Sequence, residues 1–142
     1  MIRKMRKDDI ESISKIWLDT NIKAHNFINE NYWKDNLESV KDLFLKSEIY
    51  VYEDNENVIQ GFIGLDDNYI AGIFVCQSAQ SQGIGKQLVD YVKKIKPCIN
   101  LKVYKGNTRA IKFYQRENFE IKNESIDENT GEEEYSMEWN KQ

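Results

Sequence analysis

A short loop with two glycines, Gln80 to Gly85, constrains the fold of this chain more than any other feature. The run before it, Tyr69 to Cys76, is mainly apolar and has the length of a buried strand. The run after it has apolar residues at helical spacing and stops before Pro97, where a helix is expected to end. These apolar residues are Ile84, Leu88, Val92 and Ile95. A strand, a glycine loop and a helix in succession predict an α/β (α+β) domain built around a sheet.

Two helices are predicted in the first third of the chain. The first begins near Asp8, because Asp8 and Glu11 have the spacing of a capping box. Apolar residues then recur at helical spacing in both segments, as on one face of a helix. They are Ile10, Ile13, Ile16 and Trp17 in the first helix, and Trp33, Leu37, Val40 and Phe44 in the second. The polar segment Asn21 to Asn31 separates the two helices.

Strand-type runs dominate the middle of the chain. They are rich in β-branched and aromatic residues, and turn-forming residues such as Asp and Asn separate them. This pattern predicts a three-stranded antiparallel meander. Its strands are Ile49 to Glu53, Val58 to Leu65 and Tyr69 to Cys76.

The last third is predicted to contain a strand, a helix and a hairpin. Ile99, Leu101 and Val103 alternate with polar residues, as in a half-buried strand. Asn107 is placed to cap the helix that follows, and Asn118 can close that helix in the left-handed conformation. The hairpin strands are Phe119 to Lys122 and Glu134 to Trp139, joined by an acidic turn from Asp127 to Glu133.

The composition excludes several classes of function. A net charge of −4, from 24 acidic and 20 basic residues, gives no basic surface for nucleic acid. One histidine, and two cysteines without metal-ligand spacing, Cys76 and Cys98, give no basis for a metal or disulfide site. The N-terminus lacks a signal-peptide pattern, and no apolar stretch approaches the ~20 residues that span a bilayer. We therefore expect a cytoplasmic protein that binds no nucleic acid, no membrane and no metal ion.

The glycine loop has the properties of an anion site. Glycines let the backbone approach a ligand closely, and a helix N-terminus offers unpaired N–H groups with a partial positive charge. A dinucleotide-binding loop needs a third glycine where Leu88 stands, and a P-loop needs Ser or Thr where Gln87 follows Lys86. Neither nucleotide pattern fits. The residues alone leave a phosphate site, a pyrophosphate site and a simple tight turn open.

Two segments together resemble the GNAT superfamily of N-acetyltransferases. Gln80-x-x-Gly83-x-Gly85, between an apolar strand and Leu88, is similar to the coenzyme A signature of the family. The segment Asn107 to Phe119 is similar to a later family segment, with Asn118 where the family usually has glycine. The first third of the chain matches only by the order of its elements. The resemblance implies one domain, residues 1–142, with a mixed sheet of about six to seven strands flanked by about four helices.

The resemblance also implies an activity and the residues that perform it. The activity is transfer of the acetyl group of acetyl-CoA to a primary amine of a small molecule or protein, by direct attack. Tyr114 would protonate the leaving thiolate, which suits a phenol of pKa about 10. Backbone N–H groups from Gln82 to Lys86 would hold the pyrophosphate, and one near Phe74 or Val75 the thioester oxygen. The implied cofactor-binding residues are Phe74, Val75, Gln80, Gln82, Gly83, Ile84, Gly85, Lys86, Asn107, Ala110 and Phe113.

The sequence indicates the acceptor amine and its base less clearly than it indicates the cofactor site. A lysine amine must lose a proton before it attacks, which costs roughly 4–5 kcal/mol at pH 7. His25 is the only side chain that titrates naturally near neutrality, so it is the candidate catalytic or substrate-side residue. Weaker candidates are Glu48, Glu53, Asp66 and Asp67. The acidic segment from Asp127 to Glu134 is a solvated turn or a lip that attracts cationic amines.

Several alternatives stay open at this point. A non-catalytic acyl-CoA-binding or sensing module on the same fold would have no need for Tyr114. A dinucleotide enzyme is disfavoured by Leu88, and an acetyl-cysteine intermediate on Cys76 is disfavoured against direct attack. Polyamines, aminoglycosides, amino acids and protein amines all remain as acceptors. The family resemblance implies a monomer or a weak homodimer.

Overall fold

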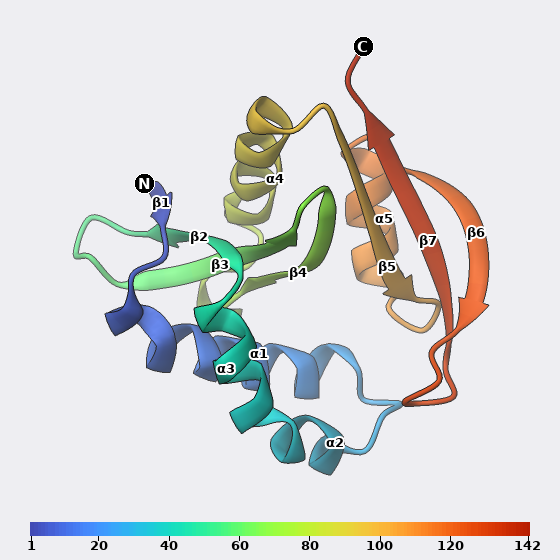
Figure 1. Ribbon diagram of the computed structural model, residues 1–142, viewed down its shortest axis with the longest axis horizontal. Coiled ribbons are helices and arrows are strands. Elements are labelled where there is room, and N and C mark those ends of the chain that lie inside the picture. Colours follow the sequence, from blue (N-terminus) through green and yellow to red (C-terminus); the bar gives the residue numbers. More distant parts are fainter.

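The computed structural model describes residues 1–142 as a seven-stranded sheet with five α-helices (Figure 1). The strands are β1 (Ile2–Lys4), β2 (Glu48–Glu53), β3 (Ile59–Asp66), β4 (Tyr69–Val75), β5 (Cys98–Tyr104), β6 (Glu120–Ile126) and β7 (Glu133–Asn140). The helices are α1 (Ile10–Ala24), α2 (Glu30–Asp35), α3 (Leu37–Leu45), α4 (Ile84–Ile95) and α5 (Thr108–Arg116). The predicted mixed sheet is therefore confirmed. No helix combines the length and the apolar composition needed to cross a membrane.

The sheet opens between its two central strands. Its strand order is β1-β2-β3-β4-β5-β7-β6, in which only β4 and β5 are parallel. The register joins these two strands at Tyr69 with Asn100 and at Ile70 with Leu101, and no farther. Both strands then continue, and Figure 1 shows the β1–β4 part and the β5–β7 part diverging. The resulting wedge lies at the carboxyl ends of β4 and β5, where parallel strands usually offer a ligand site.

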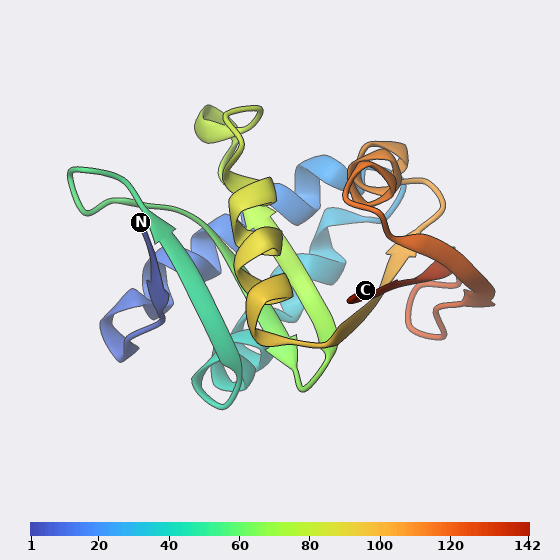
Figure 2. The same cartoon turned by 90° about the horizontal axis from the view of Figure 1, so that it is seen from above.

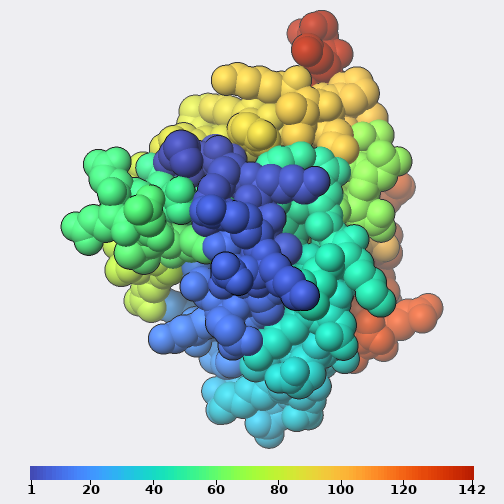
Figure 3. All heavy atoms as spheres, turned by 60° about the vertical axis from the view of Figure 1, so that its left-hand side comes forward, coloured from blue at the N-terminus to red at the C-terminus, as the bar shows by residue number.

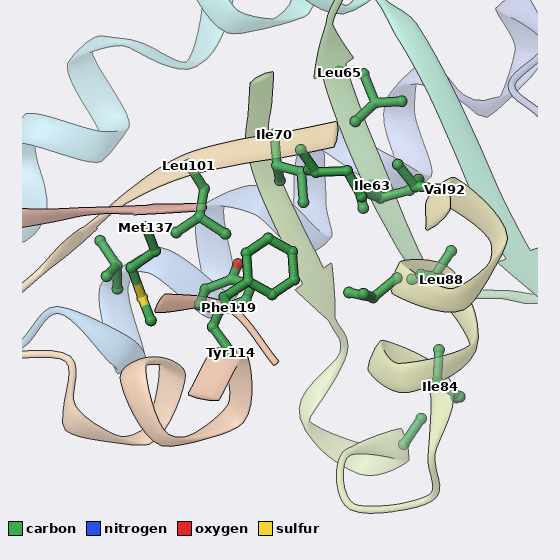
Figure 4. Close-up of a cluster of buried hydrophobic side chains, with 14 residues drawn as sticks. Ile63, Leu65, Ile70, Ile84, Leu88, Val92, Leu101, Tyr114, Phe119 and Met137 are labelled. Atoms are coloured by element: carbon green, nitrogen blue, oxygen red, sulfur yellow. The ribbon is translucent and has the colours of Figure 1, made fainter. Parts of the chain in front are cut away.

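Helices cover the two faces of the β1–β4 part of the sheet. Alternate residues of a strand face opposite sides, so Ile63 packs under α4 while Phe62 packs under α1 and α3. Figure 4 shows Leu88 and Val92 of α4 close to Ile63, in a core that continues to Tyr114 and Phe119. Viewed from above, α4 and α1 cross the sheet on opposite sides (Figure 2). This packing fixes the start of α4 at the mouth of the wedge.

The second predicted helix is two helices in the structure. A short α2 and a longer α3 meet at Asn36, whose side chain donates a hydrogen bond to the Tyr32 backbone oxygen at 2.6 Å. Asparagine side chains compete with the backbone for such partners, which interrupts a helix that its apolar spacing would otherwise continue. The apolar spacing carries no sign of this break, so the helix count is five rather than about four.

The predicted capping box at Asp8 is wrong. Residues Lys7–Asp9 form a 3₁₀ turn, and α1 begins at Ile10 with no side-chain cap. The Asp9 carboxylate instead accepts hydrogen bonds from the Arg3 guanidinium at 2.8 and 3.1 Å, and Glu53 lies 3.2 Å from the same guanidinium. These contacts tie β1 to the start of α1. Figure 3 shows the N-terminal residues lying across this face of the molecule.

Candidate active site

A cavity of about 710 Å³ lies in the wedge between β4 and β5. The candidate catalytic residues Tyr114 and His25 line it, and so do all of the predicted cofactor-binding residues except Gln82, whose side chain donates to the Ser78 backbone oxygen at 3.4 Å. The cavity brings together segments that are far apart in the chain, including α1, the residues around His25, the glycine loop, α5 and β7. It therefore has the extent to hold both a long cofactor and an acceptor.

The glycine loop forms one end of the cavity. Ser81 and Gly83 both have left-handed backbone conformations, with φ of 67° and 81°. Gly83 caps the N-terminus of α4, and a side chain there would have free space but a strained backbone. Left-handed residues ahead of a helix turn successive N–H groups toward one point, and the helix dipole adds positive potential there. This geometry is suited to a pyrophosphate.

Polar side chains hold this loop in place. Gln80 donates from Nε2 to the Val75 backbone oxygen at 3.0 Å, and its Oε1 accepts from Arg109 Nη1 at 2.7 Å. Arg109 stands in the first turn of α5 and lines the cavity, although no sequence pattern singles it out. The charge of Lys86 is less available to a ligand in the cavity, because its ammonium lies 3.3 Å from both Asp90 and Glu117. Arg109 is therefore the cation that is directly linked to the loop.

The free edge of β4 forms the floor of the wedge. The Cys76 N–H bonds to the Gln60 oxygen, and antiparallel pairing alternates between residues that face the partner strand and residues that face away. Phe74 then bonds to β3, while Ile73 and Val75 direct their backbone groups toward the wedge. The bond from Gln80 to the Val75 oxygen agrees with this register. Of the two positions predicted for the thioester donor, Val75 is the one whose N–H faces the cavity.

Tyr114 lies where α5 meets the cavity. The residue is only 6% exposed, yet its hydroxyl makes no hydrogen bond within the chain and is not among the sealed, unpartnered polar atoms. Burial raises the pKa of Tyr114 above its ordinary value, and the neighbouring Tyr69 adds to this rise. The hydroxyl therefore keeps its proton at neutral pH and has no competing partner, as a proton donor requires.

His25 lies on the acceptor side, in contact with the cap of α5. The Asn107 Oδ1 accepts from the Ala110 N–H, which turns Asn107 Nδ2 toward His25 Nε2 at 3.2 Å. Nε2 is thus the acceptor and the ring proton is on Nδ1. Burial lowers the pKa of His25 to about 4, against a smaller opposing effect of the Asn21 backbone oxygen. The ring is neutral at physiological pH, and its lone pair is already engaged.

Aromatic and acidic side chains complete the acceptor end. His25 stacks on Trp33 with ring centroids 5.3 Å apart and meets the edge of Tyr104 at 5.1 Å. Additional lining residues from this end are Trp17, Tyr69, Lys102, Asp127 and Glu134. Most of these residues lie far from the two sequence motifs in the chain, so the motifs do not identify them. Only the acidic segment from Asp127 to Glu134 is indicated by the sequence, as a lip.

The weaker base candidates do not line this cavity. Glu48 is bound by Tyr50 and Lys96, and Glu53 lies beside Arg3. Asp66 is the last residue of β3, and Asp67 lies in the β3–β4 turn. Cys76 also lies outside it, and its thiol donates to Gln60 Oε1 at 2.9 Å. No group of three or more His, Cys, Asp or Glu side chains is arranged to hold a metal ion.

Comparisons with known proteins agree with this geometry. Residues 46–121 match the family model described as an acetyltransferase (GNAT) domain. The chain is 35% identical over 123 residues to the peptidyl-lysine N-acetyltransferase YiaC of Escherichia coli K12, covering 85% of this chain and 84% of YiaC. The apo solution structure of Escherichia coli YjaB superposes with a TM-score of 0.87 at 20% identity, over 97% of this chain and 95% of YjaB. The structure of yncA from Salmonella typhimurium with its cofactor acetyl-CoA superposes with a TM-score of 0.70 at 16% identity, over 99% and 92%.

Proposed function

The chain belongs to the GNAT acetyltransferase family, and on that premise we propose that it acetylates lysine side chains of proteins. It is an acetyl-CoA-dependent N-acetyltransferase. The proposal of lysine as the acceptor is supported by its 35% identity to YiaC, which is named a peptidyl-lysine N-acetyltransferase. The observation that carries the proposal is the single cavity that joins the glycine loop, the unpartnered Tyr114 hydroxyl and an aromatic, acidic acceptor end.

The cofactor end of the cavity fits acetyl-CoA. The left-handed residues Ser81 and Gly83 and the start of α4 offer N–H groups to the pyrophosphate, and Arg109 adds a positive charge. The outward backbone edge at Ile73 and Val75 offers hydrogen bonds to the extended arm. Acetyl-CoA supplies an activated thioester at this position. The Val75 N–H is then placed to stabilise the negative charge that develops on the carbonyl oxygen.

Tyr114 is the proton donor in this proposal. Direct attack of the amine nitrogen forms the C–N bond, and the carbon–sulfur bond breaks with its electron pair on sulfur. The nitrogen, which is positively charged after attack, releases a proton to water, and the Tyr114 hydroxyl donates its proton to the sulfur and regains one from water. An acetyl-cysteine intermediate is disfavoured, because the Cys76 thiol does not line the cavity and is bound to Gln60.

His25 has a positioning role in this proposal. Its Nε2 accepts from Asn107, so the ring connects the acceptor side to the helix that carries Tyr114. A neutral ring with an occupied lone pair is a weak proton acceptor, and we assign no proton transfer to it. The two free cysteines, Cys76 and Cys98, suit a reducing compartment, and we propose that the enzyme works in the cytoplasm.

A thiol-release assay with acetyl-CoA tests the function. The panel contains lysine peptides, the same peptides with a free N-terminus and blocked lysines, polyamines and an aminoglycoside. We expect turnover with lysine peptides to exceed turnover with the blocked peptides. Release with polyamines alone would contradict the lysine proposal. Acetyl-CoA binding without turnover of any amine would instead identify a sensing module.

A further inference from the structure

The two ends of the cavity carry opposite charges. Arg109 lies at the glycine-loop end, where it is bound to Gln80. Asp127 and Glu134 line the other end, with Lys102 as the only cation beside them. Glu117 also lines the cavity, but Lys86 and Lys93 compensate its charge. An anionic cofactor and a cationic acceptor would each meet complementary charge at separate ends.

Of the two acidic residues, Glu134 has the weaker contacts within the chain. It lies on β7, opposite Tyr104 on β5 and Ser125 on β6, and its side chain is only 13% exposed. Its Oε1 accepts from Ser125 Oγ at 3.4 Å and lies 3.9 Å from Lys102 Nζ, both close to the limit of such contacts. No hydrogen bond or ion pair within the chain reaches Oε2. Oε2 is not among the sealed, unpartnered polar atoms, so it is accessible to a ligand in the cavity that Glu134 lines.

Asp127 differs from Glu134 in its hydrogen bonds within the chain. Its Oδ2 accepts from the Tyr104 hydroxyl at 2.5 Å, and its Oδ1 accepts from the Asn129 N–H at 2.9 Å. Both oxygens are therefore occupied, and the residue orders the β6–β7 turn. Asp127 adds negative potential to this end of the cavity, while Glu134 has an oxygen free to bind.

Glu134 shares its cavity with two tyrosines, Tyr69 and the proposed proton donor Tyr114. Burial raises the pKa of Tyr69, and the charges of Glu134 and Asp127 add to the rise. The pKa of Tyr114 is raised by burial and then by Tyr69 in the same way. Glu134, Tyr69 and Tyr114 all line the cavity. The unpartnered Tyr114 hydroxyl, in a residue that is only 6% exposed, independently indicates that a ligand belongs beside them.

We infer that Glu134 binds the ammonium group of the acceptor, with Asp127 reinforcing the negative potential, so that this end of the cavity selects primary alkylammonium groups. The inference rests on the proposed acetyl transfer, because it names how the same cavity recognises its acceptor. Lys102 opposes this selection, since its ammonium lies near the same carboxylate. The bound ammonium loses its proton to solvent before attack, so Glu134 acts in binding and orientation.

The test compares Glu134→Gln with Glu133→Gln on a lysine peptide. Glu133 is the neighbouring strand residue, 62% exposed and paired with Lys105 at 2.7 Å, so it is a matched control outside the cavity. We expect Glu134→Gln to raise KM for the peptide roughly tenfold or more, the range of a charge-assisted contact, with kcat changed less than about threefold. Glu133→Gln is expected to leave both unchanged. Lys102→Met is expected to lower KM, an opposite effect that misfolding would not produce.

The pH profile of kcat gives a second readout. A carboxylate beside an ammonium raises the pKa of the amine, so Glu134→Gln is expected to move the rise of kcat to lower pH. The groups that face this position are Lys102 and Tyr104 on β5, Tyr69 on β4, Ser125 on β6 and Asp127 in the turn. An unchanged KM in Glu134→Gln would overturn the inference. A large drop in kcat, by about two orders of magnitude, without a change in KM would overturn it too, because that result describes a proton acceptor.

These experiments distinguish a wrong inference about Glu134 from a wrong proposed function. If lysine peptides are acetylated and Glu134→Gln retains the wild-type KM, the function holds and the inference fails. If only polyamines are acetylated and Glu134→Gln raises their KM, the inference holds and the lysine proposal fails. Acetyl-CoA binding, measured by calorimetry, is expected to be equal in the wild type and Glu134→Gln, which confirms that the variant is folded.

Discussion

Tyr114 and His25 are two titratable side chains that burial keeps uncharged, with opposite chemical consequences. An uncharged tyrosine still carries the proton it can donate, and its raised pKa retains that proton above pH 10. An uncharged histidine carries a lone pair, and here Asn107 occupies it. In the proposed mechanism Tyr114 is therefore the proton donor, while His25 has a positioning role.

Replacing Tyr114 by Phe removes the hydroxyl and little else. The hydroxyl makes no hydrogen bond within the chain, so the fold and the Kd for acetyl-CoA are expected to stay the same. We expect kcat to fall by about two to four orders of magnitude, the usual contribution of a positioned proton donor. Steady-state kinetics measure this, with thermal melting as the control for folding. A variant with the wild-type kcat between pH 7 and 9 would remove Tyr114 from the mechanism.

The lowered pKa of His25 predicts how the stability of the protein depends on pH. The unfolded chain has a histidine of ordinary pKa, about 6.5, whereas the pKa in the folded protein is about 4. As pH falls from 6.5 to 4, the unfolded chain takes up the proton first, so folding stability decreases over this window by up to about 3 kcal/mol. Urea unfolding at pH 7, 5.5 and 4.5 measures the decrease.

Two variants separate the positioning role of His25 from the role of a base. His25→Gln retains an oxygen that accepts from Asn107, so we expect it to keep most of kcat and to lose the pH-dependent part of stability. His25→Leu removes the acceptor, and we expect a clear loss of kcat. If both variants lost activity equally, the hydrogen bond to Asn107 would not be the property that matters.

The glycine loop, α4 and α5 are connected to one another, and in the proposed mode of binding they hold the cofactor together. Gly83 starts α4, Asn107 caps α5, and Arg109 connects the first turn of α5 to the loop through Gln80. Gly85 faces the Phe113 ring, where an added side-chain carbon would come within 3.4 Å. That is an ordinary van der Waals distance, so Gly85 packs directly against α5. Loop shape and cofactor affinity should change together.

Arg109→Ala tests this connection. It removes a charge from the cofactor end and releases Gln80, so we expect the Kd for acetyl-CoA to rise roughly tenfold. Lys112→Ala changes an exposed cation on the same helix that does not line the cavity, and it is the matched control. Isothermal titration measures both values. Equal Kd values in the two variants would show that Arg109 has no special connection to the site.

Local patterns predict most elements but miss those that depend on side-chain competition. The strands and the last two helices follow from periodicity and from Asn107, which caps α5 as predicted. Asn118 takes the predicted left-handed conformation, with φ of 71°. The predictions around Asn36 and Asp9 are wrong because these side chains bind Tyr32 and Arg3, and spacing alone does not reveal such partners.

At the scale of the whole molecule, the opening of the sheet forms one cavity with two different ends. The early divergence of β4 and β5 creates a cavity with a cationic end near α5 and an anionic end near β7. The residues of the proposed cofactor end could be selected from the sequence because they are close together in it and form a recognisable motif. The acceptor end could not, because it depends on contacts such as that of His25 with Asn107, which are 82 residues apart. Tyr69 and Glu134 line the same cavity from different strands of the sheet.

The most direct test of lysine acetylation by this enzyme is mass spectrometry of a lysine-containing protein substrate after incubation with acetyl-CoA. We expect acetyl groups on lysine side chains, formed by the wild type and reduced by about two orders of magnitude or more in Tyr114→Phe, with the same acetyl-CoA affinity in both. Equal acetylation by the two proteins would contradict the role of Tyr114. Binding of acetyl-CoA by the wild type, with no acetyl group transferred to any lysine, would contradict the proposed function itself.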